Sequence, residues 1–127
     1  SEPYHPETEN AVYYLSEIPE IHAILAGHSH SVFPGPTFKD IPMANLNEGK
    51  IKGKPVVMAG AFGSRLGIID LQLEVKDGKW KVVNSTSFTR SIVDETGNPL
   101  VKTDKRLFKL IKPAHQETVD FLKKLGL

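Results

Sequence analysis

The chain has 127 residues, of which 39% are hydrophobic and 24% are charged, and this composition is typical of one globular domain. Its formal net charge is +1, with no basic stripe that would indicate binding to a nucleic-acid polymer. No apolar run approaches the roughly 18 residues that a transmembrane helix needs. Cysteine is absent, which excludes disulfides and thiolate ligands and leaves His, Asp, Glu and Asn to hold a metal.

The first part of the chain predicts a helix, a buried strand and a sharp turn. Residues 8–18 are expected to form a helix with Thr8 as its N-cap, and Pro19 stops it. The short apolar run 22–26 then predicts a buried strand that ends at Gly27. A helix followed by such a strand indicates an α/β fold.

The middle of the chain predicts a long loop, a second buried strand and a hairpin. We expect residues 31–54 to be a loop with one short strand near Lys50, and residues 55–59 to form the strand. Residues 66–76 and 79–90 are expected to pair around Asp77-Gly78, a strong hairpin signal. Apolar and polar residues alternate along the first of these strands, so one face of the hairpin should be apolar and the other solvated.

The end of the chain predicts a turn at residues 94–99 and then an amphipathic helix. Asp104 is a suitable N-cap, and apolar residues follow at helical spacing as far as Leu125. Pro113 lies inside this pattern and lacks a backbone donor. We therefore expect a kink or a break near residues 109–112.

His28 and His30 are the main candidates for a functional site. One residue separates them, so both imidazoles can reach the same side of an extended or tightly turned segment. They follow a strand that ends in glycine, and loops held by a rigid sheet often carry reactive groups. Imidazole is a strong ligand for zinc, iron and manganese, but a catalytic metal generally needs about three protein ligands. The pattern predicts part of a metal site, with two unrelated polar histidines as the alternative.

The other candidates have ordinary structural explanations. The glycine-rich run 60–67 lacks the Lys-Ser/Thr ending of a P-loop, so it is interpreted as a tight loop that borders a site. Arg65 can pair with a phosphate oxygen, although a solvated side chain or a surface ion pair is more usual. Phe33 and Phe62 can stack on a base, with loop packing as the more common role. No direct role is expected for the remaining histidines, His5, His22 and His115.

The Gly27-His28-Ser29-His30 stretch resembles Gly-His-x-His, the last signature block of the calcineurin-like metallophosphoesterases. Residues 9–15, 32–35, 57–60 and 66–71 are similar to the bacterial 2',3'-cyclic-nucleotide 2'-phosphodiesterase/3'-nucleotidase branch, which is related to the 5'-nucleotidases. The resemblance covers nearly the whole chain. It implies an α/β fold that is part of a metallophosphoesterase sandwich, with mixed β-sheets flanked by helices.

In that family two divalent metal ions (Mn, Zn, Fe or Mg) lie side by side. The resemblance implies that His28 binds the second ion and His30 the first, and that the pair activates a water for attack on the phosphoryl group. The expected substrates are 2',3'-cyclic nucleotides, converted to 3'-nucleotides, and 3'-nucleotides, converted to nucleoside plus phosphate. The alternatives are a 5'-nucleotidase or another nucleotide phosphoesterase, or a non-catalytic metal-binding module completed by a partner chain.

Three blocks of the family pattern are missing: Asp-x-His, Gly-Asp and Gly-Asn-His, which supply the other ligands and the catalytic histidine. The resemblance therefore implies the C-terminal half of the catalytic domain in residues 1–103 and, in residues 104–127, a helix that leads toward a C-terminal nucleotide-binding domain. We expect a fragment that is inactive alone, has no catalytic residue of its own and is completed by the remaining half of the domain. Family likeness also implies an extracytoplasmic location, whether periplasmic, secreted or cell-wall associated.

Overall fold

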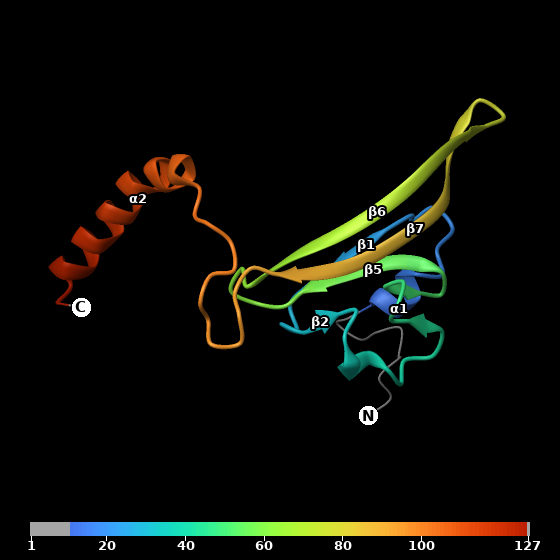
Figure 1. Cartoon of the computed structure of the whole chain (residues 1–127), viewed down its shortest axis with the longest axis horizontal. Helices are drawn as coiled ribbons and strands as arrows, with labels where there is room; N and C mark the ends of the chain where they lie inside the picture. Colours follow the sequence, from blue (N-terminus) through green and yellow to red (C-terminus); the bar gives the residue numbers. More distant parts are fainter. Residues whose placement is uncertain (1–10, 127) are drawn as a thin grey trace.

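The computed structural model describes residues 11–126. Two β-sheets lie against each other, a short helix covers the larger sheet, and a long helix lies apart from both (Figure 1). The larger sheet contains the strands β1 (Ile24–Ala26), β2 (Val32–Phe33), β3 (Ala44–Asn45), β4 (Lys50–Ile51) and β5 (Lys54–Ala59). The hairpin consists of β6 (Arg65–Lys76) and β7 (Lys79–Ser91), and the helices are α1 (Val12–Leu15), η1 (Pro36–Phe38) and α2 (Lys105–Lys124).

Strand β5 is the centre of the larger sheet. It pairs with β1 in parallel and with β2 and β4 in antiparallel fashion, so three segments that are separate in the sequence meet along one strand. The strand expected at residues 55–59 is confirmed and begins one residue earlier, at Lys54. Its run of valines and methionine is buried because it has neighbours on both faces.

The two faces of β5 pack against different parts of the chain. Val56 and Met58 belong to the apolar core, together with Ile24, Phe33 and Ile51. On the other face Val57 lies beneath the hairpin, where a Cβ atom at Gly67 would be 3.0 Å from its Cγ2. Gly67 therefore allows the hairpin to approach β5 closely, since any side chain there would need the valine to shift.

The hairpin expected around Asp77-Gly78 is confirmed. Both turn residues have positive φ, at 53° and 73°, as a tight two-residue hairpin turn requires. The expected apolar face is solvated as well over the distal half of the hairpin, residues 71–82, where Leu71, Leu73 and Val75 are all exposed. That half extends beyond the larger sheet, and no element within residues 11–126 covers it (Figure 1).

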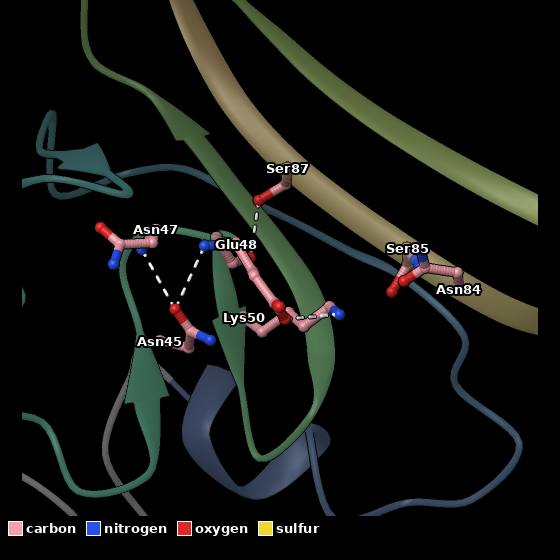
Figure 2. A network of polar contacts seen from close by, with 8 residues as sticks. Asn45, Asn47, Glu48, Lys50, Asn84, Ser85 and Ser87 are labelled. Atoms are coloured by element: carbon pink, nitrogen blue, oxygen red, sulfur yellow. Dashed lines mark hydrogen bonds and ion pairs between the residues drawn. The ribbon is translucent and has the colours of Figure 1, made fainter.

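A polar network joins the proximal half of β7 to the larger sheet, as Figure 2 shows. Ser87 is 2% exposed, and its hydroxyl lies between the carbonyl oxygens of Gly49, at 2.6 Å, and Val56, which share its single proton. Its backbone N–H donates to the carbonyl oxygen of Glu48 at 2.9 Å. Nearby, Asn45 Oδ1 accepts from the backbone N–H groups of the turn between β3 and β4. The buried hydroxyl is thus fully used, as a polar group in a core must be.

The first two elements are shorter than the sequence predicts. Helix α1 ends at Leu15 and not at residue 18, and the N–H groups of Glu17 and Ile18 then donate to carbonyl oxygens three residues back, in a tightened last turn. The expected cap Thr8 lies outside the described residues. Strand β1 begins at Ile24, two residues later than expected, and the prediction that it is buried holds for Ile24 but not for Leu25, which is 81% exposed.

Residues 31–54 are more ordered than the loop that the sequence predicts. They contain η1 and the short strands β2, β3 and β4, of which β4 matches the strand expected near Lys50. Their apolar residues Phe33 and Ile51 are buried in the core. Tertiary packing therefore orders these short strands, although the sequence shows no periodic pattern that predicts them.

Helix α2 confirms the predicted helical pattern and its cap. The Asp104 carboxylate accepts a hydrogen bond from the backbone N–H of Arg106. The helix is continuous across Pro113, so a break is excluded. Its apolar stripe is exposed to solvent along most of its length. No helix within residues 11–126 is long and apolar enough to cross a bilayer.

Candidate metal-binding loop

The candidate site lies where two strands of the larger sheet end side by side. Strands β1 and β5 are parallel, and Ala26 pairs with Met58, so their carboxyl ends meet at one edge of the sheet. The loop of residues 27–31 leaves β1 there, and the loop of residues 60–64 leaves β5. The carboxyl ends of parallel strands are the usual place for ligand sites in α/β sheets.

The histidine loop has an unusual backbone. His28 and His30 have φ values of 67° and 57°, in the left-handed region that few residues other than glycine adopt. The Ser29 N–H donates to the Gly27 carbonyl at 2.8 Å, and the Ser29 hydroxyl contacts the Met58 sulfur at 3.1 Å. Both histidines are exposed at the sheet edge. Strained conformations of this kind are concentrated at functional sites, because the fold must hold them in place.

The two loops are joined to each other. The Gly60 N–H donates to the Ser31 carbonyl at 3.0 Å, and Val32 pairs with Ala59 just before it. A Cβ atom at Gly60 would lie 3.2 Å from Val32 Cγ2, so glycine permits this approach, and its φ of 76° also favours glycine. Residues 27–31 are therefore held both by the strand before them and by the loop across from them.

The structure places the candidate histidines in different parts of the fold. His28 and His30 share one loop, whereas His22 lies before β1, at the opposite end of that strand, and His115 lies on α2. His5 lies outside the described residues. Within residues 11–126 no group of three or more His, Asp or Glu side chains could hold a metal ion. His28 and His30 offer two imidazole nitrogen donors on one loop, and the described residues do not complete a donor set.

Arg65 begins β6 next to the two loops. Its Cδ would be 4.0 Å from a Cβ atom at Gly60. The side chain lines a hollow of about 370 Å³ with Ser31 and Thr37, and a second hollow of about 500 Å³ with Asp94. The pKa of Asp94 is lowered because the Thr96 hydroxyl and the Asn98 backbone N–H donate to its carboxylate. Arg65 thus lies at the border of the candidate site, and the tight loop expected at residues 60–67 ends at residue 64, where β6 follows.

The two aromatic candidates have different roles. Phe33 is 1% exposed and packs edge-on against Phe38, with ring centroids 5.4 Å apart, so it is a core residue and cannot stack on a base. Phe62 is 100% exposed and is not part of the core, and its ring centroid lies 6.0 Å from that of His30 on the neighbouring loop. This contact crosses between the two loops, and sequence reasoning missed it because no periodicity relates residues 30 and 62.

The sequence of the chain is similar to those of several known bacterial proteins. The chain is 42% identical over 125 residues to the 2',3'-cyclic-nucleotide 2'-phosphodiesterase/3'-nucleotidase of Salmonella typhimurium, an alignment that covers 98% of the chain and 19% of the relative. The protein of the same name from Yersinia enterocolitica is 40% identical over 96% of the chain. The trifunctional nucleotide phosphoesterase YfkN of Bacillus subtilis is 38% identical over 91% of the chain and 8% of its own length. No family model matches.

The fold leads to the same family. The crystal structure of the calcineurin-like phosphoesterase YfkN from Bacillus subtilis matches with a TM-score of 0.81 and 37% identity, over 91% of this chain and 34% of that one. The chain therefore belongs to the calcineurin-like phosphoesterases, and the α/β fold expected from the sequence is confirmed as part of theirs. Its sequence relatives are bacterial 2',3'-cyclic-nucleotide 2'-phosphodiesterase/3'-nucleotidases, of whose length it spans about a fifth.

Proposed function

We propose that the chain is part of a dinuclear-metal phosphoesterase that hydrolyses 2',3'-cyclic nucleotides to 3'-nucleotides and 3'-nucleotides to nucleoside plus phosphate. The main support is the placement of Gly27-His28-Ser29-His30 at the joined carboxyl ends of β1 and β5, in a chain whose relatives carry those two activities in their names. Residues 1–103 are assigned to the second half of the catalytic domain. Residues 104–127 are assigned to a helix that leads toward a nucleotide-binding domain.

His28 and His30 are the proposed metal ligands. Their imidazoles supply nitrogen donors suited to manganese, zinc or iron, on a loop whose strained backbone is held by β1, Met58 and Gly60. When bound, two divalent ions would activate a water and stabilise charge on the phosphoryl oxygens. The chain's own contribution is to fix the two imidazoles relative to each other. The remaining ligands and the catalytic histidine are assigned to the other half of the same domain.

A comparison of substrates tests this function. The complete protein, assayed with manganese, should hydrolyse 2',3'-cyclic AMP and 3'-AMP much faster than 5'-AMP. A preference for 5'-AMP would instead establish the 5'-nucleotidase alternative. The proposed extracytoplasmic location is tested by fractionation of the native cells, in which the activity should leave with the periplasmic or cell-wall fraction.

A second candidate is a non-catalytic metal-binding module that a partner chain completes. Like the enzyme, such a module would take its remaining metal ligands from outside the described residues. The test mixes residues 1–127 with a separately expressed segment that carries the Asp-x-His, Gly-Asp and Gly-Asn-His blocks. Hydrolysis of 3'-AMP by the mixture supports the enzyme, whereas tight manganese binding without hydrolysis supports the module.

A further inference from the structure

Phe62 occupies a position that the fold does not explain. Its side chain is 100% exposed, so it contributes nothing to the core. It is also the first central residue of a turn in which the Ser64 N–H donates to the Ala61 carbonyl at 3.2 Å, with φ values of 58° at Phe62 and 64° at Gly63. Two consecutive positive φ values are the pattern of a type I′ turn, for which Asn-Gly is the preferred pair. A bulky aromatic residue there is strained and exposed at once.

The turn places the Phe62 ring beside the histidine loop, residues 27–31. The Gly60 N–H to Ser31 carbonyl bond fixes the start of the turn against that loop. The ring centroids of Phe62 and His30 are 6.0 Å apart, at an interplanar angle of 57°, within the range in which aromatic rings attract each other in tilted geometries. His30 itself has a φ of 57°, so two strained residues from opposite loops bring their rings together.

We propose that Phe62 is a positioning residue whose ring holds the imidazole of His30 in the orientation needed to bind a metal. The inference rests on the proposed function, in which His30 is a ligand. A metal–nitrogen bond is directional, so a ring that limits rotation of an exposed imidazole lowers the cost of binding. The backbone strain at Phe62 is retained because the ring has this use.

The turn provides a variant that separates the ring from the backbone. Phe62→Asn removes the ring and places the preferred residue in the turn, so folding should be preserved. Phe62→Tyr keeps the ring, and Trp80→Asn removes an aromatic residue that is 72% exposed near the tip of the hairpin, away from the site. His30→Ala reports whether the ligand assignment itself is correct.

The measurement is Mn²⁺ affinity of the complete protein by isothermal titration calorimetry, followed by kcat and KM for 3'-AMP at saturating Mn²⁺. Phe62→Asn should weaken Mn²⁺ binding about 3- to 10-fold, from the usual worth of an aromatic pair. Phe62→Tyr and Trp80→Asn should stay within about twofold of the wild type. The KM for 3'-AMP should be unchanged in Phe62→Asn, because the ring acts on the histidine.

Four results would overturn the inference. If Phe62→Asn binds Mn²⁺ normally but raises the KM for 3'-AMP, the ring contacts the nucleotide instead. If Phe62→Asn unfolds, Phe62→Leu is decisive, because a folded leucine variant with normal Mn²⁺ affinity shows that only bulk is needed. If His30→Ala binds Mn²⁺ as the wild type does, the ligand assignment fails and this inference with it. Loss of binding in His30→Ala with normal binding in Phe62→Asn refutes the inference alone.

Discussion

Strand β5 and the distal half of the hairpin both carry large apolar residues, yet their surroundings differ completely. Val56 and Val57 are 1% and 4% exposed, whereas Leu73 and Val75 are 49% and 57% exposed. The hairpin forms because its turn and its cross-strand pairs are local, and they need no cover from elsewhere. Burial, in contrast, depends on partners that come from distant parts of the chain. The candidate site lies at the end of the buried strand, where the backbone can be held under strain.

The largest expected effect is a loss of activity when the histidine loop is changed. His28→Ala and His30→Ala should each lower hydrolysis of 3'-AMP by the complete protein by about two orders of magnitude or more, because each removes a proposed metal ligand. His115→Ala, on the exposed helix α2, should change the rate little. Steady-state kinetics at saturating manganese measures all three, and similar losses at the three positions would contradict the site.

The free energy of unfolding should likewise depend on whether the changed side chain is buried. Phe33→Ala removes a ring that is 1% exposed and should lower the free energy of unfolding by about 3–5 kcal/mol. Trp80→Ala, at a side chain that is 72% exposed near the hairpin tip, should change it by less than about 0.5 kcal/mol. Urea unfolding followed by far-ultraviolet circular dichroism gives both values. Equal losses would mean that the distal hairpin is covered in solution.

Two glycines provide a finer test at the junction of sheet and hairpin. A Cβ atom at Gly49 would lie 2.1 Å from the Ser87 carbonyl oxygen, whereas at Gly53 nothing lies within 4 Å, and both residues have positive φ. Gly49→Ala should therefore cost about 2–4 kcal/mol, from strain and overpacking together. Gly53→Ala should cost about 1 kcal/mol, from strain alone. The same unfolding measurement distinguishes them, and equal costs would show that the hairpin can move away from Gly49.

The smallest predicted effect is at the cap of helix α2. The Asp104 pKa is lowered because the Arg106 side chain and the Arg106 backbone N–H donate to its carboxylate. The stabilisation is thus present above the pKa of the unfolded chain and is lost as the pH falls through the lowered value. Asp104→Ala should reduce the helicity of residues 105–108 at pH 7, and the difference from the wild type should vanish in acid.

Backbone amide chemical shifts report this effect residue by residue. Asp94→Ala is the matched control, since the pKa of Asp94 is lowered too, in a loop that caps no helix. A loss of helicity in that variant, or a difference at Asp104 that persists in strong acid, would contradict the capping role.

The sequence predicts the features that depend on local pattern. The Asp77-Gly78 turn, the apolar run in β5 and the Asp104 cap were all expected, because each rests on a few neighbouring residues. The spacing of His28 and His30 and the glycine before them also predict that the two act as a pair. Their role as metal ligands stays a prediction.

The remaining features depend on contacts between distant residues. Ser87 lies on a hairpin strand as a polar residue would on a solvated face, yet it is buried because Gly49 and Val56 present carbonyl oxygens to it. The exposure of Leu25 and the pairing of the His30 and Phe62 rings likewise arise from the arrangement of strands. No periodicity in the sequence encodes such contacts.

Strand β1 forms the outer edge of the larger sheet. Among the described residues it pairs with β5 alone, and Leu25 is exposed beside its free backbone groups. An unpaired edge with an apolar side chain is a template for another strand. A synthetic peptide with a matching apolar strand should therefore add to the sheet along β1.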